Sequence, residues 1–241
     1  IITARPEIGY LHTGIEKECE VKTWQQVTPL TDRVDYLSNL INNLCYALAV
    51  EKLLQLEIPD KAQWMRVMLS ELQRLNSHLV WLGTHALDMG AMSMFFYCFR
   101  ERETILKIFE MFSGQRMMTS YIRIGGLALE PPRGWHKTVS AFINDFDSKV
   151  DEYENLLNTN PIWMERTKGV GIVPLEELID LGVTGPCLRA AGLKIDARKD
   201  EPYSSYEKFD FEIPVRTEND VYARFRVRMD ETVSYTHLTL P

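Results

Sequence analysis

The chain has 241 residues, of which 45% are hydrophobic and 25% charged, and its formal net charge is -7 at pH 7. This apolar content can bury a substantial core, so we expect a globular protein rather than a disordered one. The acidic balance and the lack of any run of Lys and Arg argue against nucleic-acid binding, because neutralising phosphates requires a basic face.

The four cysteines are scattered singly along the chain, at Cys19, Cys45, Cys98 and Cys187. Their spacing predicts neither a zinc site nor a paired redox motif, and scattered thiols suit a reducing compartment. The first residue is Ile1, and no charged-then-apolar leader follows it. We therefore expect no signal peptide and interpret the sequence as an internal fragment of a longer protein.

The hydropathy pattern begins with residues 1–29, which mix β-branched and polar side chains and are predicted to be an irregular N-terminal segment. Residues 30–160 are predicted to form a helical bundle, because apolar side chains recur there at helical spacing. Thr31, which follows Pro29, is the expected N-cap of the first helix. The four helices are expected at residues 31–59, 60–83, 92–118 and 132–157.

The stretch 75–99 needs a separate check, since it is long enough to cross a membrane and carries few ionisable groups. Small polar residues and glycines interrupt it, and Asp88 near its middle would be costly in lipid. We predict two buried helices of a soluble body here, with any membrane association provided by partners.

After residue 160 the sequence changes to short apolar runs separated by glycine and proline. We predict a small α/β region over residues 161–231, in which alternating apolar residues at 209–213 and 221–227 indicate a hairpin joined by the polar loop 216–220. The expected fold class is therefore mainly α, a helical bundle with a small α+β part.

Several common catalytic motifs are missing from the sequence. It contains no GxGxxG after a strand, no Walker loop, no HExxH and no GxSxG. Nucleotide binding, zinc-dependent hydrolysis and serine hydrolase chemistry therefore lack their usual groups.

The informative motif is Arg-Pro-Glu-Ile-Gly-Tyr-Leu-His-Thr-Gly-Ile-Glu-Lys at residues 5–17, followed by Thr-Pro-Leu-Thr-Asp-Arg-Val-Asp-Tyr at 28–36. Here the chain resembles the D subunit of respiratory complex I, the 49-kDa-type protein at the quinone site. The resemblance is specific because it continues in order to about Glu231, through residues 49–54, 70–75, 99–103 and 121–126. It implies the fold of the large subunit of nickel-iron hydrogenases, to which this family is related.

Two positions separate the chain from those hydrogenases. Their first helix supplies two nickel thiolates, and the matching positions here are Asp35 and Ser38. Nickel and iron in such a site need soft thiolate ligands, so carboxylate and hydroxyl groups exclude a hydrogenase centre of that kind. The resemblance implies that the former metal cavity holds a quinone head group instead.

The resemblance implies that Tyr36 is the head-group ligand, donating a hydrogen bond from its phenol. It also implies that Asp88 supports proton delivery to the reduced quinone, and we include His85 as a group that hands protons onward from Asp88. Without the resemblance, Asp88 is a helix C-terminal acid facing water, and a lone histidine is a satisfied core or surface group. The apolar flanks of Asp88 also allow a buried acid with a raised pKa.

Arg33 and Arg123 match arginines that the family places beside the terminal iron-sulfur cluster of the neighbouring protein of the complex. Positive charge there would favour the reduced cluster, whereas the alternative is ordinary ion pairing. Many family members carry a histidine where this chain has Met118. A methionine cannot titrate, so any coupling of proton uptake to cluster reduction through that position is in doubt.

The resemblance further implies that the chain is one component of a proton-translocating NADH:quinone oxidoreductase, the complex I of respiratory electron transport. The chain alone is not expected to be active. No cofactor is expected on this chain: quinone is the substrate, the iron-sulfur cluster belongs to the B subunit, and NAD and FMN act elsewhere in the complex. The C subunit and the H subunit of the membrane arm are the other expected partners, and nucleic acid is not expected. The expected location is the cytoplasmic side of a bacterial inner membrane, as a peripheral protein.

Two alternatives remain open: a component of a related hydrogenase or of a ferredoxin- or deazaflavin-dependent membrane dehydrogenase, and a non-catalytic scaffold. Residues 232–241 show no helical period where the family continues as a helix. We interpret them as a non-family tail.

Overall fold

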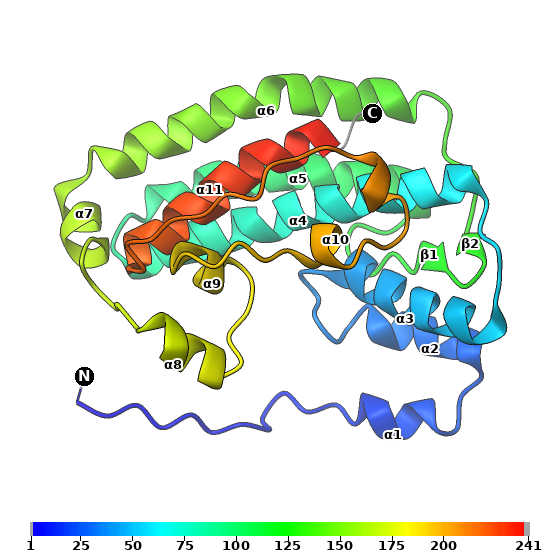
Figure 1. The fold of residues 1–241 in the computed structure, drawn as a ribbon. Coiled ribbons are helices and arrows are strands. Elements are labelled where there is room, and N and C mark those ends of the chain that lie inside the picture. Colours follow the sequence, from blue (N-terminus) through cyan, green and yellow to red (C-terminus); the bar gives the residue numbers. More distant parts are fainter. Residues whose placement is uncertain (1, 239–241) are drawn as a thin grey trace.

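The structure, a computed structural model, describes residues 2–238 and is mainly helical, with one small antiparallel hairpin (Figure 1). The predicted fold class is confirmed in this respect. The α-helices and strands, in chain order, are α1 Ile15–Cys19, α2 Trp24–Thr31, α3 Asn39–Leu54, α4 Asp60–Asp88, α5 Ser93–Ser113, β1 Ile122–Arg123, β2 Gly126–Leu127, α6 Trp135–Asn158, α7 Pro161–Thr167, α8 Leu175–Asp180, α9 Pro186–Ala190, α10 Ala197–Asp200 and α11 Val221–Leu238. A 3-10 helix, Tyr206–Lys208, lies before α11.

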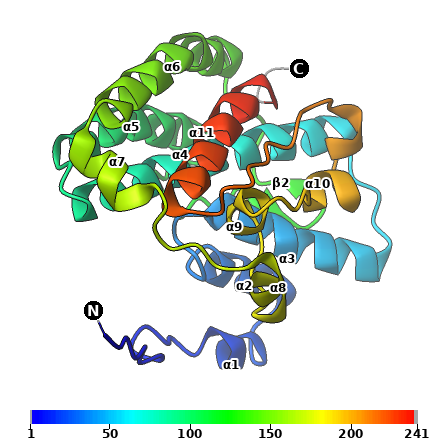
Figure 2. The ribbon, with the colours of Figure 1, turned by 60° about the vertical axis from the view of Figure 1, so that its left-hand side comes forward.

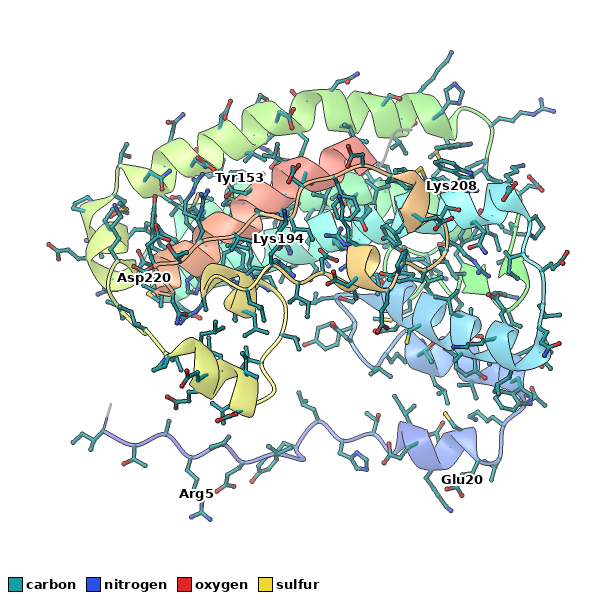
Figure 3. The ribbon with its side chains drawn as sticks, in the orientation of Figure 1. Arg5, Glu20, Tyr153, Lys194, Lys208 and Asp220 are labelled. Carbon is teal, nitrogen blue, oxygen red and sulfur yellow. The ribbon has the colours of Figure 1, made fainter. Side chains whose placement is uncertain are left out.

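Helix α4 runs through the centre of the molecule and packs against α5, α11 and α3. Helix α6 crosses the outer side of α5 and α11, and Tyr153 on it donates a 2.7 Å hydrogen bond to Glu101 of α5 (Figure 3). The two-stranded hairpin pairs Ile122 with Leu127 and packs against α3 and α4. The N-terminal residues form an arm that lies apart from the helices in both ribbon views (Figures 1 and 2).

The predicted helices over residues 60–83, 92–118 and 132–157 are confirmed as α4, α5 and α6, although α4 continues to Asp88 and α5 ends at Ser113, before Gly114 with its left-handed φ of 76°. Helices α4 and α5 pack closely, since a Cβ atom at Gly83 would lie 3.3 Å from the Cα of Phe95. None of the helices described is both long and apolar enough to cross a membrane. Six residues that recur at helical spacing along α6 are all buried: Val139, Phe142, Phe146, Val150, Tyr153 and Leu157.

The prediction for the chain before α4 was wrong in two respects. Residues 1–29 contain α1 and most of α2, and Thr31 is the last residue of α2 instead of an N-cap. Helix α2 begins at a cap that lies inside the supposedly irregular segment, where the Thr23 N–H donates to the side chain of Gln26 at 3.0 Å. The predicted helix over 31–59 is therefore interrupted by a loop at residues 32–38, before α3 begins.

The predicted hairpin near the C-terminus was also wrong, because residues 221–227 belong to helix α11. Ala223 and Val227 pack with Ala190 of α9, whereas Phe225 and Met229 belong to the main core. Within each of these two pairs the apolar residues are four apart, as on one face of a helix. Because the two pairs are offset by two residues, together they give an apolar residue at every second position, which is the pattern of a strand. The predicted loop before it contributes Asp220, which accepts a 2.6 Å hydrogen bond from the Ala223 N–H at the start of α11 (Figure 3).

The expected lack of helix in residues 232–241 is wrong up to Leu238, where α11 ends. Helix α11 therefore contains much of the segment that was interpreted as a non-family tail. Residues 239–241 lie outside the described part of the chain.

A buried ion pair joins α3, α4 and the hairpin. Arg66 is fully buried and binds both carboxylate oxygens of Glu51, at 3.0 and 2.6 Å. The same guanidinium donates to the carbonyls of Arg123 and Gly126, and Glu51 accepts from the N–H of Gly125 at 2.8 Å. The pair thus fixes the hairpin that carries Arg123.

A second buried carboxylate attaches the chain before α11 to α4. Glu71 of α4 is fully buried and accepts hydrogen bonds from Arg198 at 3.0 Å, from Arg74 at 3.1 Å and from the hydroxyl of Tyr206. Arg198 also binds Asp196. The network compensates the burial of Glu71 and holds α10 and the following turn on the central helix.

Replacing Arg66 with methionine is predicted to lower the free energy of unfolding by about 3–5 kcal/mol, because it leaves Glu51 buried without its cation. Urea denaturation measures this change. The double variant Glu51→Leu with Arg66→Met should recover part of the loss. Lys61→Met is the control, since the Lys61–Glu130 pair is exposed and should contribute little. Equal stability of the Arg66→Met variant and the wild type would contradict the structural role of the pair.

His78 of α4 predicts a loss of stability in acid. Its Nδ1 lies 3.2 Å from the hydroxyl of Thr232, and burial, with the charges of Arg228, Arg74 and Arg198, lowers its pKa to about 3. A folded-state pKa below the unfolded value means that the contribution of His78 is present above about pH 6.5 and is lost as the pH falls toward 3. Stability should therefore fall by roughly 2 kcal/mol between pH 6.5 and 4.5 through this group.

Urea denaturation across that pH range tests the role of His78. The His78→Gln variant should show a smaller slope of stability against pH, and His136→Gln, a change at an exposed histidine of α6, should keep the wild-type slope. An unchanged slope in His78→Gln would contradict the assignment.

Candidate functional site

The 32–38 loop carries the candidate quinone ligand and is fixed at both ends. Asp32 is fully buried, and its carboxylate accepts from Asn43 of α3 at 2.7 Å and from the N–H and the hydroxyl of Ser120. At the other end, Gln73 of α4 donates a 2.6 Å hydrogen bond to the carbonyl of Leu37. The loop is therefore bound to α3, to α4 and to the segment that leads into β1.

Asp32 is the anchor of the loop on the Ser120 side. Burial raises its pKa, although hydrogen bonds from Ser120 and Asn43 and the charge of Arg33 oppose the rise. These donors compensate the buried carboxylate, and Ser120 adopts a left-handed φ of 42° while it donates to Asp32. The contact holds two segments together that are 88 residues apart in sequence.

Tyr36 is 56% exposed although its loop is fixed. Among the described side chains, those of residues 2–234, no hydrogen-bond partner of its hydroxyl is found, so the phenol is available to a ligand. Asp35 accepts a 3.0 Å hydrogen bond from the N–H of Leu37 and so stabilises the turn. Among the described residues, no group of three His, Cys, Asp or Glu side chains could hold a metal ion.

The structure brings Arg33 and Arg123 to the same region. Arg33 follows Asp32, and Arg123 follows Ser120 by three residues, so the Asp32–Ser120 contact makes their segments neighbours. Both side chains are exposed; Arg33 donates to the carbonyl of Pro29, and Arg123 donates to the carbonyl of Ser120 at 3.0 Å. Among the side chains that the structure describes, those of residues 2–234, neither arginine forms an ion pair with a carboxylate within 4.0 Å.

Met118 belongs to the segment next to this region, two residues before Ser120, and is half-buried. Asn39 at the start of α3 donates to the carbonyl of Met117 and so ties this segment to the end of the 32–38 loop. Met118 is therefore five residues from Arg123 in sequence, on the segment that Asp32 and Asn39 bind. A thioether at this position offers no titratable group.

Asp88 lies at the far end of α4, where it is the last helical residue and is exposed. The structure thus agrees with the interpretation of a helix C-terminal acid facing water and not with a buried acid. Gln73, which binds the 32–38 loop, precedes Asp88 by fifteen residues, or about 22 Å along a helix axis. No contact within the described chain joins Asp88 to Tyr36.

His85 lies one turn before Asp88 in an aromatic environment. Its ring stacks on Trp81, with centroids 5.4 Å apart, and meets the edge of Trp163 of α7 at 5.5 Å. Burial and the charge of Arg228 lower its pKa, and the charge of Asp88 opposes them. The lowered pKa favours the neutral imidazole, and the buried Nε2 has no hydrogen-bond partner among the described side chains, those of residues 2–234.

The sequence did not indicate the groups that position these residues. Asp32 and Gln73 are polar residues inside runs that were assigned to helices, and nothing in their spacing showed that both would bind the 32–38 loop. Arg228 was overlooked because it lies just after the apolar alternation that was interpreted as a strand. Arg228 follows Arg224 by four residues, which places both on the same face of a helix. This spacing is informative only if the segment is predicted to be helical.

Comparison with known proteins gives the class and then the family. The sequence model described as "Respiratory-chain NADH dehydrogenase, 49 Kd subunit" matches residues 88–238, which is more than half of the chain. The D 1 subunit of NADH-quinone oxidoreductase from Solibacter usitatus is 72% identical over 231 residues, covering 96% of this chain and 56% of that protein. The corresponding D 2 subunits from Koribacter versatilis and Chloroflexus aurantiacus are 60% and 59% identical, each over 96% of this chain and over 58% and 56% of their own lengths.

Each of these relatives is named as a D subunit of an NADH-quinone oxidoreductase. The chain belongs to the family of the 49-kDa subunit of respiratory-chain NADH dehydrogenase. It spans a little over half of the length of the curated relatives that it matches.

Replacing Asp32 with asparagine is predicted to release the loop, because an amide nitrogen would face donors of Ser120 and Asn43. We expect the free energy of unfolding to fall by about 1–3 kcal/mol, measured by urea denaturation. Asp145→Asn, at an exposed position of α6, is the control and should change the free energy of unfolding little. If hydrogen exchange at residues 33–38 were equally slow in Asp32→Asn and wild type, Asp32 would not be the anchor.

Proposed function

We propose that the chain forms the quinone head-group site of a proton-translocating NADH:quinone oxidoreductase, next to the terminal iron-sulfur cluster of a partner protein. The observation that supports this most directly is the exposed Tyr36 on a loop that three other segments hold in place. A fixed loop binds a ligand with little loss of conformational entropy, which favours a binding role for an exposed aromatic side chain.

Tyr36 would bind one carbonyl oxygen of the quinone by donating its phenolic hydrogen. Reduction adds two electrons and two protons, and each carbonyl oxygen becomes a hydroxyl. A donor close to an oxygen that gains negative charge lowers the free energy of the reduced states more than that of the quinone. Tyr36 would thus both orient the head group and favour its reduction.

Arg33 and Arg123 would face the partner's cluster. Their side chains are exposed, lie on neighbouring segments and have no carboxylate partners within the described chain. Two positive charges near a cluster stabilise its more negative, reduced form. In this proposal the partner's cluster supplies the electrons, and the arginines of this chain adjust its potential.

Asp88 and His85 would deliver protons. Asp88 is exposed and can exchange protons with water, and His85 lies one helical turn away with a neutral ring that can both accept and donate. Their distance from the 32–38 loop along α4 means that this path needs further groups or water to reach a quinone bound at Tyr36. The segments that supply them would come from the rest of the protein or from its partners.

The partners in this proposal are the B subunit with its iron-sulfur cluster, the C subunit and the H subunit of the membrane arm. NAD and FMN would act in other parts of the complex, and the assembly would lie on the cytoplasmic side of a bacterial inner membrane. The relatives named NADH-quinone oxidoreductase favour NADH as the source of electrons over ferredoxin or a deazaflavin. Carboxylate and hydroxyl groups at Asp35 and Ser38 argue against a nickel site, which nickel analysis of the purified complex tests.

Replacing Tyr36 with phenylalanine is predicted to lower the apparent quinone affinity or the turnover about tenfold, because one hydrogen bond to the head group is lost. Quinone reductase activity of the assembled complex, measured over a range of quinone concentrations, tests this. Tyr97→Phe on α5 is the matched control and should leave both values unchanged. Unchanged activity and affinity in Tyr36→Phe would remove the proposed role.

The scaffold alternative makes a different prediction for the same site. If the chain only bridges other proteins of the complex, changing both Tyr36 and Asp88 would leave assembly and turnover intact. Loss of turnover in a fully assembled double variant, judged by the protein composition of the purified complex, would exclude it.

A further inference from the structure

Arg102 of α5 is a buried cation with weak partners. The residue is 8% exposed. One guanidinium nitrogen donates to the sulfur of Met117 at 3.9 Å, and the guanidinium carbon lies 5.4 Å from the centroid of the Phe99 ring. A thioether is a weak acceptor, and a phenyl ring attracts a cation more weakly than a carboxylate does. The Nε atom of Arg102 is buried and has no hydrogen-bond partner among the described side chains, those of residues 2–234.

The acids beside Arg102 in sequence bind other arginines. Glu101 binds Arg100 at 2.6 Å, and Glu103 binds two nitrogens of Arg116 at 2.5 and 2.7 Å. Among the described side chains, Arg102 forms no ion pair with a carboxylate within 4.0 Å. Burial and the charge of Arg116 lower the pKa of Arg102, and the charge of Glu103 opposes them. Within residues 2–234 this guanidinium therefore lacks a counter-ion.

The chemistry around Arg102 favours a carboxylate as that counter-ion. A buried cation without an anion is strongly unfavourable for folding, and the contact with the ring offsets only part of this cost. The planar guanidinium presents parallel donors that match the two oxygens of a carboxylate. A phosphate has more acceptor oxygens and more charge, and the thioether of Met117 and the ring of Phe99 offer no donor to them.

The curated relatives show that much protein lies outside this chain. The chain covers 56% and 58% of the lengths of two of them, and both are named as subunits of an oxidoreductase. We infer that Arg102 is the binding site of a carboxylate side chain supplied from outside residues 1–241, either by the rest of the protein or by a neighbouring subunit.

The position of Arg102 places this binding site close to the end of the 32–38 loop. Met117, which Arg102 contacts, accepts a hydrogen bond through its carbonyl from Asn39, the first residue of α3. The carboxylate would thus attach another protein segment beside the loop that carries Tyr36. The inference does not require Tyr36 to bind quinone, so it can fail or succeed independently of the proposed function.

The structure of the assembled complex, determined by electron cryo-microscopy, tests the inference directly. We expect a carboxylate oxygen within about 3 Å of a guanidinium nitrogen of Arg102. The chain that carries this carboxylate distinguishes the two sources. A guanidinium that meets no carboxylate from outside residues 1–241 would overturn the inference.

The Arg102→Met variant tests the inference energetically, because the sign of its effect depends on the anion. If a carboxylate binds Arg102, the variant leaves that acid buried without its cation. Release of a neighbouring subunit should then become faster by about tenfold or more. If the acid belongs to the same protein, the urea midpoint of the full-length protein should fall instead. Without an anion, methionine removes an uncompensated charge, so an unchanged release rate with an unchanged or higher midpoint would overturn the inference.

Two further variants separate the charge of Arg102 from its size. Arg102→Lys keeps the charge but not the parallel donors, so its effect should be smaller than that of Arg102→Met. Arg133→Met changes an exposed arginine before α6 and should leave both quantities unchanged. Assembly of Arg102→Lys but not of Arg102→Met would support the inference, and if neither assembles, the wild-type structure decides. Replacing the located acid with leucine in the Arg102→Met background should recover part of the loss.

Discussion

The structure depends on the burial of polar and charged side chains along α4. Arg66, Glu71, Gln73 and His78 all lie on this one helix and face other segments of the chain. An ionised group in the interior is several kcal/mol unfavourable unless a partner compensates it, so each segment around α4 must supply one. Helix α3 supplies Glu51, and the segment before α11 supplies Arg198 and Tyr206. The order in which elements surround α4 is thus determined by polar pairing as much as by apolar contact.

The same constraint explains why an exposed loop can be rigid. The 32–38 loop has few buried apolar side chains. Its Asp32 carboxylate and the carbonyl of Leu37 instead accept hydrogen bonds from Asn43 and Gln73, which are buried polar side chains that also require partners. The hairpin is similar, because the backbone of residues 123–126 completes the hydrogen bonds of the Glu51–Arg66 pair. Tyr36, Arg33 and Arg123 are therefore presented on short segments of fixed conformation, as a binding site requires. Their exposure does not imply mobility.

The sequence predicted the elements whose apolar residues follow one pattern, and it failed where two patterns overlap. Helices α4 and α6 have long, continuous helical periods, so they were predicted close to their observed bounds. Helix α11 has buried apolar residues on two faces, one packed against α9 and one in the main core. Taken together, these residues alternate along the sequence as in a strand. The start of α3 was missed for another reason. The apolar period continues through residues 31–38, and the tertiary contacts of Asp32 and Gln73 hold this segment as a loop, together with the local turn at Asp35. Such long-range hydrogen bonds leave no local signal in a sequence.

For the candidate site, family resemblance indicated which residues to consider, and the geometry divides them into two groups. Tyr36, Arg33 and Arg123 lie around the contact of the 32–38 loop with Ser120, whereas Asp88 and His85 lie at the end of α4. With Met118 unable to bind a proton, the first group lacks a titrating histidine, so in the proposed function proton uptake belongs to the second. In that group, burial lowers the pKa of His85, the charge of Arg228 lowers it further, and the charge of Asp88 opposes them. In the proposed function, separating electron entry from proton entry along one helix would let each be adjusted by its own charges, because about 20 Å of protein and water strongly weakens the interaction between them.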